Sequence, residues 1–352
     1  WRAAKPAERL PPRVLSIMRG VNDRTQRPPS LSCVMPAYNE AANLPRVVDE
    51  VCTALAALAP CFELIVVDDG SRDDSAAVVA ALLPRHPQLV LLRLSRNFGK
   101  EAALSAGLDA ARGEVVLVMD ADGQHPVALL PEMLRLWTQG LDVVYAVRRT
   151  RADQPRLYRW LARGFYRLVN AGNRFQVPPD AGDFRLMDRR AVEALKAMPE
   201  RNRFMKGLFA WAGLSSAALP YAPLARHSGV SRYGLRGAIG LGVTGLLAFT
   251  AAPLRLFGLL GVLMALCAMS YGVWVVFEYF VVGIEVPGYA TIVVGLMLLS
   301  GVQLMSVGLL SEYVARIYDE VKRRPLYWLG ERLGAGLDTA APPPPDTAPT
   351  PR

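Results

Sequence analysis

The chain has 352 residues, of which 52% are hydrophobic, and its formal net charge at pH 7 is +9. This length accommodates one soluble domain of about 200 residues together with a membrane module. The four cysteines form no CxxC pair, which argues against a zinc site or a disulfide framework and fits a reducing cytoplasm. A secretory signal peptide is not expected, because residues 1–30 lack an apolar core segment.

Basic residues are concentrated at the start of the chain. Residues 1–30 contain seven Arg or Lys and two acidic residues, and we expect this segment to be a flexible extension. A basic excess suits nucleic acid, anionic lipid or phosphorylated ligands. The basic residues are not interleaved with a recognisable nucleic-acid-binding module, so lipid and phosphate are the expected partners and nucleic acid is not.

From residue 31 the sequence alternates between short apolar runs and longer helical patterns. The apolar runs are typical of strands that are buried on both faces of a parallel sheet, and Asn39 and Ser71 are candidate N-caps. This alternation predicts a doubly wound, mainly parallel α/β sheet in a domain at residues 31–235. The expected strands are Leu31–Pro36, Phe62–Val67, Leu89–Leu94, Val115–Met119 and Val143–Val147, and the expected helices are Glu40–Leu58, Asp73–Leu83, Lys100–Ala110 and Pro126–Trp137.

Polar motifs follow the first two strands, where ligands bind in sheets of this kind. The motif at Pro36–Glu40 is, taken alone, an ordinary strand-to-helix turn. The motif Asp68-Asp69-Gly70-Ser71 offers acceptors for a nucleobase N–H group. An Asx-type turn that leads into a helix explains the second motif equally well.

A third motif, Asp120-Ala121-Asp122-Gly123-Gln124, follows the fourth strand. Its two carboxylates can converge on a divalent cation that bridges a diphosphate and neutralises a nucleotide leaving group. The spacing excludes an EF-hand, and His125 is expected to be a loop residue. Together, the motifs after the first, second and fourth strands are predicted to converge on one crevice.

A row of arginines at helical spacing follows the fifth strand: Arg156, Arg159, Arg163 and Arg167. The row is either a solvated basic face or, beside a membrane, a site for anionic headgroups or a lipid phosphate. Arg163 is the candidate phosphate contact from this row.

Two apolar stretches near the C-terminus, Leu256–Phe277 and Val286–Ser311, are long enough to cross a bilayer, for which a helix needs about 20 residues. Arg and Lys flank their outer ends, whereas the connector at residues 278–288 has none, so both flanks are expected in the cytoplasm. The expected segments are an interfacial amphipathic helix at 236–254, transmembrane helices at 255–284 and 286–311, a cytoplasmic C-terminal segment at 312–332 and a disordered proline-rich tail at 333–352.

Seven sequence blocks occur in order along the chain: VMPAYNE, IVVDDGS, SRNFGKEAAL, MDADGQHP, AGDFRLMDR, NRFMKGLFAWAG and RHSGVSRY. With the two spans, this order resembles the membrane-bound polyprenyl-phosphate glycosyltransferases, which are inverting GT-A-fold enzymes that include dolichol-phosphate mannose synthase. The bacterial branch that acts on undecaprenyl phosphate is the most similar. The resemblance covers residues 31 to about 325.

The resemblance implies roles for individual residues. Asp183 would orient or deprotonate the acceptor, or position Arg185. Arg232 stands where the family more often has a Lys, so a planar guanidinium replaces a compact ammonium there. The implied catalytic residues are Asp120, Asp122, Asp183 and Arg226, and the implied ligands of Mg²⁺ or Mn²⁺ are Asp120, Asp122 and Gln124. The implied nucleotide-sugar contacts are Pro36, Tyr38, Glu40, Val66, Asp68, Asp120, Ala121, Asp122, Arg148 and Arg226. The expected acceptor-phosphate contacts are Arg185, Ser231 and Arg232, together with Arg163 from the arginine row.

The resemblance also implies a reaction. One sugar would pass with inversion from a UDP-hexose such as UDP-glucose to polyprenyl (undecaprenyl) phosphate, at the cytoplasmic face of the bacterial inner membrane, for cell-envelope glycan modification. It further implies a homo-oligomer such as a tetramer. A membrane-tethered nucleotide-sugar-binding subunit without catalysis is one alternative. A processive polysaccharide synthase is another, although the QxxRW motif of such enzymes is missing from the sequence.

Overall fold

The computed structural model describes residues 24, 28–148, 164, 170, 177–178, 181–201, 203–222, 224, 252–281 and 288–339. The arginine row after the fifth expected strand lies outside the described residues. Most of the expected interfacial segment, residues 236–251, also lies outside them.

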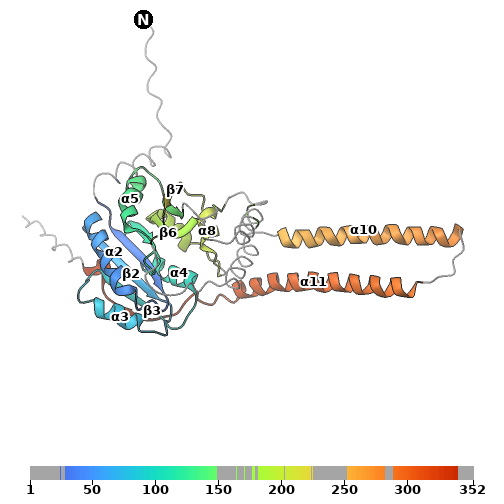
Figure 1. The fold of residues 1–352 in the computed structure, drawn as a ribbon, viewed down its shortest axis with the longest axis horizontal. Helices are drawn as coiled ribbons and strands as arrows, with labels where there is room; N and C mark the ends of the chain where they lie inside the picture. Colours follow the sequence, from blue (N-terminus) through green and yellow to red (C-terminus); the bar gives the residue numbers. More distant parts are fainter. Residues whose placement is uncertain are drawn as a thin grey trace, which may run out of the picture.

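An eight-stranded mixed sheet forms the centre of the domain (Figure 1). Its strands are β1 Leu31–Ala37, β2 Phe62–Asp68, β3 Leu89–Leu94, β4 Val115–Val118, β5 Val143–Arg148, β6 Ala181–Asp188, β7 Ser216–Tyr221 and β8 Leu329–Leu333. They lie in the order β7-β5-β6-β4-β1-β2-β3-β8. The four central strands from β4 to β3 are parallel, whereas β6 and β8 run antiparallel to their neighbours. The predicted parallel α/β sheet is confirmed at the centre, and all five expected strands are present to within one residue.

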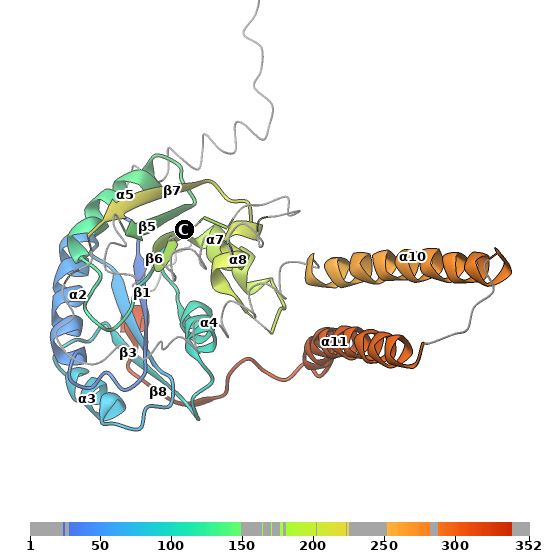
Figure 2. The same cartoon turned by 45° about the vertical axis from the view of Figure 1, so that its right-hand side comes forward.

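Helices cover both faces of the sheet, as the doubly wound prediction requires (Figures 1 and 2). Val51 of α2, Val79 of α3 and Met133 of α5 belong to the core on one face. Leu104 of α4 and Val192 of α7 belong to the core on the other face, with α8 beside them. The helix bounds are α2 Leu44–Leu58, α3 Ser75–Leu82, α4 Lys100–Ala110, α5 Leu130–Thr138, α7 Arg189–Lys196 and α8 Met205–Trp211, and a 3₁₀ turn, η1 Val127–Leu129, precedes α5.

Helix α4 approaches the sheet so closely that one of its positions must be glycine. A Cβ atom on Gly107 would lie 2.2 Å from Cγ1 of Val34 in β1. A contact this short cannot be relieved without moving the helix or the strand. The close packing fixes α4 against β1 and β2, and so fixes the position of Lys100 at its first turn.

The expected helix N-caps at Asn39 and Ser71 are wrong, because α2 and α3 begin several residues later, after Asn43 and Asp74. Asn39 instead has a positive φ of 54°. Its N–H group donates to Ser71 Oγ at 2.9 Å, and its Oδ1 accepts from Arg72 N at 2.7 Å. The two polar residues therefore join the loops that follow β1 and β2.

Two long helices, α10 Ala252–Val281 and α11 Tyr289–Val321, project from one side of the domain (Figure 1). By length and composition each can cross a membrane, and their apolar windows are not buried by protein. The expected spans were 255–284 and 286–311, so α10 begins and ends three residues earlier and α11 continues to Val321. The residues that link the two helices, 282–287, lie outside the described part of the chain.

After the two long apolar helices, the chain returns to the sheet. Residues 325–339, here called the C-terminal strap, contain β8 and the 3₁₀ turn η2 Gly336–Thr339. Leu337 N donates to Glu63 Oε2 at 3.4 Å at the far end of the strap. The expectation of disorder from residue 333 is therefore wrong for residues 333–339. Because β8 is held at the edge of the sheet by its backbone and its side chains are largely exposed, it has no buried apolar pattern that the sequence could reveal.

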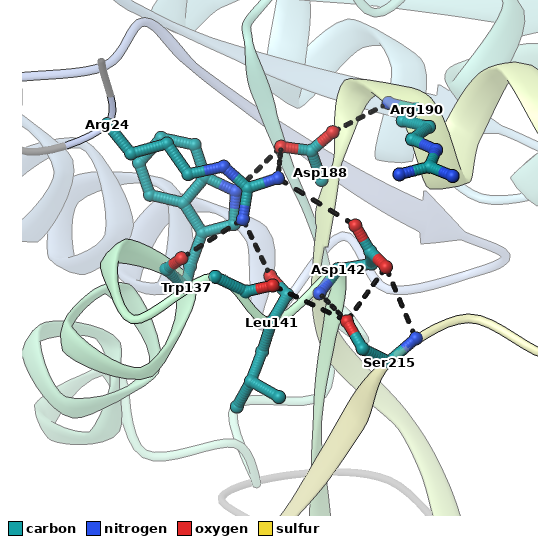
Figure 3. Close-up of polar contacts among 8 residues, drawn as sticks. Arg24, Trp137, Leu141, Asp142, Asp188, Arg190 and Ser215 are labelled. Carbon is teal, nitrogen blue, oxygen red and sulfur yellow. Dashed lines mark hydrogen bonds and ion pairs between the residues drawn. The ribbon is translucent and has the colours of Figure 1, made fainter. Parts of the chain in front are cut away.

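Arg24 is anchored to the domain, which departs from the expected flexibility of residues 1–30 (Figure 3). Its guanidinium lies 2.8 Å from Asp188 Oδ2 and donates to the carbonyl oxygens of Trp137 and Leu141 at 3.2 and 3.1 Å. It also lies over the Trp137 ring, 4.9 Å from the centroid. Charge, hydrogen bonding and ring stacking thus hold this residue against the end of α5 and the start of β5.

Candidate active site at the carboxyl ends of the strands

The motifs after β1, β2 and β4 lie at the same edge of the sheet, because these strands are parallel neighbours. Pro36 and Val66 lie within the paired strands, and Tyr38 lies in the loop after β1. Glu40 Oε2 accepts from Asn43 Nδ2 at 2.6 Å, so the glutamate also secures the start of α2. The predicted convergence of the three motifs is confirmed at the level of the backbone.

The two adjacent acids after β2 have different environments. Both carboxylate oxygens of Asp69 face the loop after β3: Oδ1 accepts from Phe98 N at 2.8 Å and Oδ2 accepts from Gly99 N at 3.0 Å. Burial raises the pKa of Asp69, and these two hydrogen bonds oppose the shift. Asp68 Oδ1 accepts from Ser71 N at 3.1 Å, and its buried Oδ2 lies 3.8 Å from Nε of Arg93 but has no hydrogen-bond partner among the described residues. Asp69 therefore holds the loop, and Asp68 retains an acceptor for a ligand.

The Asp120–Gln124 loop is shaped by a tight turn. Gly123 has φ +70°, and a Cβ atom there would lie 2.3 Å from Nη2 of Arg46. Asp122 Oδ1 accepts from Gln124 N at 3.0 Å within the turn. Gln124 Oε1 accepts from Nη2 of Arg148, at the end of β5, at 3.4 Å. The turn thus presents two carboxylates from one loop, with Ala121 buried beneath them.

His125 lies in this loop, as expected, but its ring is buried and has a structural role. It stacks on Phe184 with ring centroids 4.7 Å apart, and its Nδ1 accepts from Asp120 N at 3.1 Å. Burial lowers the pKa of His125, although nearby carboxylates oppose the shift. A neutral ring matches the acceptor role of Nδ1. His125 therefore holds the backbone of Asp120 in place.

Lys100 is the main residue that sequence reasoning did not single out. Its Nζ lies 2.6 Å from Asp120 Oδ1 and 2.6 Å from Asp183 Oδ2. Burial alone would lower the pKa of Lys100, but the two carboxylates outweigh it and raise that pKa. The only sequence signal was its place in the SRNFGKEAAL block. Its ammonium joins the loop after β4 to strand β6.

Asp183 is held as a carboxylate by the cations around it. Burial would raise the pKa of its carboxyl, but Lys100, Lys206 and Arg185 together hold that pKa well below its usual range. A carboxylate with so low a pKa accepts a proton poorly at neutral pH. The alternative in which Asp183 positions a cationic neighbour fits this environment, and the closest cation is Lys100.

The structure places Arg185 in the interior, which departs from the expected contact with the acceptor phosphate. The side chain is 2% exposed, and its guanidinium lies 3.4 Å from the centroid of the Phe209 ring. Its Nη2 donates to Gly182 O at 2.7 Å. Burial lowers the pKa of Arg185 to about 10, against the pull of Asp183. Arg185 thus supports β6 from behind Asp183. Arg163, Arg226, Ser231 and Arg232 lie outside the described residues.

The donor set of this site fits a divalent cation that is shared with a substrate. Within the described ranges, no three His, Cys, Asp or Glu side chains are grouped closely enough to hold a metal by themselves. Mg²⁺ usually takes one or two protein carboxylates and completes its shell with water and phosphate oxygens. Asp120 and Asp122 supply two such carboxylates on one rigid loop.

Comparison with known proteins identifies relatives along most of the chain. The family described as "Glycosyl transferase family 2" matches residues 32–196, and "GtrB C-terminal hairpin" matches residues 252–317. The chain is 38% identical to an uncharacterized glycosyltransferase of Synechocystis over 304 residues, which cover 86% of this chain and 96% of that protein. It is 38% identical to a prophage-derived bactoprenol glucosyl transferase of Shigella flexneri over 298 residues, with 84% and 96% covered. A solved mannosyltransferase of Pyrobaculum calidifontis, in complex with GDP-mannose and Mn²⁺, is similar at 18% identity and a TM-score of 0.44, with 88% and 94% covered.

Proposed function

Because this chain belongs to glycosyl transferase family 2, in the group of polyprenyl-phosphate glycosyltransferases with a C-terminal membrane hairpin, we propose that it transfers glucose from UDP-glucose to polyprenyl phosphate. The observation that carries this proposal is a set of carboxylates at the strand ends, Asp120, Asp122 and Asp183, in the same chain as a membrane hairpin. The polyprenol is the bactoprenol named for the Shigella relative.

The donor binds at the carboxyl ends of β1, β2 and β4. Asp68, whose buried Oδ2 accepts no hydrogen bond from the described residues and lies 3.8 Å from Arg93 Nε, accepts from the nucleobase, and Tyr38 and Glu40 line the same edge. Arg148 reaches the Asp122 loop through Gln124 and lies where a diphosphate would be bound. The charge of the guanidinium suits that ligand.

The reaction is a displacement with inversion. A phosphate oxygen of the lipid attacks the anomeric carbon, a new carbon–oxygen bond forms, and the bond to the UDP oxygen breaks, so that UDP leaves with the electron pair. The acceptor phosphate is already anionic at neutral pH, so a strong general base is not required. This agrees with the low pKa of Asp183. The chain therefore contributes positioning and charge: Lys100 and Asp183 hold Asp120 toward the donor.

A divalent metal, Mg²⁺ or Mn²⁺, is proposed to be held by Asp120 and Asp122, with Gln124 beside them. When bound, it would neutralise charge on the leaving diphosphate. Lys100 occupies one oxygen of Asp120, so it also limits how many protein ligands the ion can take. Binding of the ion together with the nucleotide is expected, and a titration of each ion with and without UDP measures it.

The catalytic domain is proposed to lie on the cytoplasmic side of the bacterial inner membrane. Lys322, Arg323 and Arg324 follow α11 directly, and positive residues favour the cytoplasmic side of a span. A homo-oligomer such as a tetramer remains a prediction, and light scattering of the detergent-solubilised chain measures it.

The test uses the full-length chain with labelled UDP-glucose and polyprenyl phosphate. Asp122→Asn is expected to lower transfer by about 100-fold or more, because one charge of the metal and diphosphate site is lost. Membrane insertion and the thermal midpoint should not change. Glu132→Gln is the matched control, since it removes an exposed carboxylate that pairs with Arg135 on α5.

Three results would contradict the proposal. Normal turnover by Asp122→Asn would remove the metal-site assignment. Donor binding without product, in the wild-type chain, would favour a binding subunit. A polymer in place of a lipid that carries one sugar would favour a processive synthase.

A further inference from the structure

The cytoplasmic end of α11 carries a guanidinium whose hydrogen-bonding capacity is not met. Arg316 lies within the apolar window Gly295–Val321, and its side chain is 17% exposed. Nη2 donates to Glu312 Oε1, one turn earlier on the same helix, at 3.2 Å. Nε and Nη1 are buried and have no hydrogen-bond partner in the described part of the chain.

Such an arrangement is costly unless an acceptor completes it. A guanidinium stays charged at any ordinary pH, and a buried donor without an acceptor costs free energy. The Glu312 side chain, which is half exposed, accepts from only one of the three guanidinium nitrogens of Arg316. An anion rich in oxygen acceptors would satisfy the remaining donors and balance the charge of the guanidinium.

The location of Arg316 connects it with the catalytic domain. One helical turn further on, Glu320 Oε1 accepts from Arg201 N at 2.7 Å. Arg203, two residues along, donates through Nη1 to Ser105 Oγ on α4 at 3.1 Å. Helix α4 begins at Lys100, the residue that holds Asp120 and Asp183. Arg316 is therefore placed between the apolar part of α11 and the contacts that lead to the helix that carries Lys100.

We propose that Arg316 binds the phosphate of the polyprenyl phosphate acceptor through its unpartnered donors. This inference rests on the proposed function, because that function supplies a phosphate monoester on a lipid. A monoester carries about −1.5 to −2 charges at pH 7, more than a phosphodiester headgroup, so it compensates the guanidinium more fully. Arg316 would thus add a contact from the helical hairpin to the acceptor-phosphate contacts expected from the sequence.

The experiment uses full-length Arg316→Gln and Arg316→Lys in nanodiscs of phosphatidylcholine. Lys322→Gln is the matched control: it removes the same charge from the same end of α11, but its ammonium already lies over the Tyr318 ring at 3.9 Å. For each variant, the KM for polyprenyl phosphate, the KM for UDP-glucose and direct binding of polyprenyl phosphate by native mass spectrometry are measured.

Arg316→Gln is expected to raise the KM for polyprenyl phosphate about tenfold and to weaken its direct binding, because a charged hydrogen bond is lost. The KM for UDP-glucose should stay within twofold, which also establishes that the variant is folded. The KM of Arg316→Lys for polyprenyl phosphate should lie between the values of Arg316→Gln and the wild type. The KM of Lys322→Gln should match the wild-type value.

The inference is overturned if Arg316→Gln binds polyprenyl phosphate as the wild type does. It is also overturned if adding phosphatidylglycerol to the nanodiscs competes equally with polyprenyl phosphate for the wild type, since Arg316 would then serve bulk anionic lipid. If the wild type forms no product, the proposed function fails. The direct-binding measurement still tests Arg316 in that case.

Discussion

Lys100 shows how one side chain organises charges from distant parts of the chain. Asp120 follows β4 and Asp183 lies on β6, and both carboxylates contact the same ammonium at 2.6 Å. Without that ammonium, the two partly buried carboxylates would lose their closest compensating charge, which is costly in an interior. The lysine is therefore a positioning residue for the site.

Lys100→Met is expected to lower kcat by about 100-fold or more, since the catalytic carboxylates lose their fixed geometry. The pKa of the Asp183 carboxyl should rise, because its closest cation is lost. The measurement is kcat against pH for wild type, Lys100→Met and Lys100→Arg. Partial recovery is expected in Lys100→Arg, which keeps the charge but not the point geometry. A kcat for Lys100→Met that equals the wild-type value would contradict this role.

Glu101, next to this lysine, makes stability depend on pH. Burial raises the pKa of its carboxyl to about 7, helped by Asp183 and opposed by Lys100 and by the hydrogen bond from Met205 N. The folded state thus holds a proton on Glu101 that the unfolded chain releases near pH 4.5. The contribution of Glu101 to the free energy of unfolding is complete below that pH and is lost as the pH rises to about 7. The total loss is about 3 kcal/mol.

Glu101→Gln is therefore expected to flatten this dependence. Thermal midpoints of the detergent-solubilised chain at about pH 5.5 and about pH 8 measure the effect. The wild type should lose more stability between the two pH values than the variant does. Equal losses in both proteins would show that Glu101 does not titrate in this range.

Among the elements, the C-terminal strap has the broadest consequence for the site. Strand β8 pairs with β3 from Leu91 to Leu94, and Ser95 N donates to Trp328 O at 2.9 Å just beyond the pairing. Tyr327 OH donates to Asp109 Oδ2 on α4 at 2.9 Å. The strap thus covers the open edge of β3 and holds both ends of the segment that contains Lys100.

Gly334→Ala is expected to detach the strap. Gly334 has φ +86°, and a Cβ atom there would lie 2.2 Å from Leu89 O, a backbone atom of β3. The conformational strain alone costs about 1–3 kcal/mol, and trypsin should cleave faster after Arg332 in β8. Cleavage is followed by mass spectrometry of the intact chain.

Gly213→Ala is the control for the strap. It also has a positive φ, +62°, but its Cβ would meet only Trp211 O at 3.9 Å. Gly213→Ala therefore introduces the backbone strain of a positive φ but no steric clash of its Cβ atom. Equal cleavage after Arg332 in both variants would mean that strain alone accounts for the effect and that Gly334 is not needed for docking.

At the scale of the whole molecule, the domain is connected to its membrane helices at both of their ends. Helix α10 follows the domain in sequence, and α11 leads into the strap, so the hairpin returns to the sheet (Figure 1). Glu320 adds a side-chain contact near the end of α11. Two connections restrict the orientation of the domain more than one would, which suits a reaction between a soluble donor and a lipid.

The sequence by itself determined the central strands, the motifs that follow them and the two long apolar helices. Each of these depends on a local pattern: a run such as Phe62–Val67 is apolar enough to be buried on both faces, and a stretch such as Leu256–Phe277 is long enough to cross a bilayer. The convergence of Glu40, Asp68 and Asp120 also followed, because parallel neighbours end at one edge.

Only the tertiary structure decided which charges meet. Lys100 and Asp183 are 83 positions apart, and no local pattern marks the insertion of β6 between β4 and β5 that brings them together. The docking of Arg24 and the return of β8 to the sheet are likewise contacts between distant segments. Such contacts depend on backbone hydrogen bonds and on single ion pairs, which leave no periodic pattern in the sequence. The burial of whole strands and helices, in contrast, requires a periodic pattern of apolar residues.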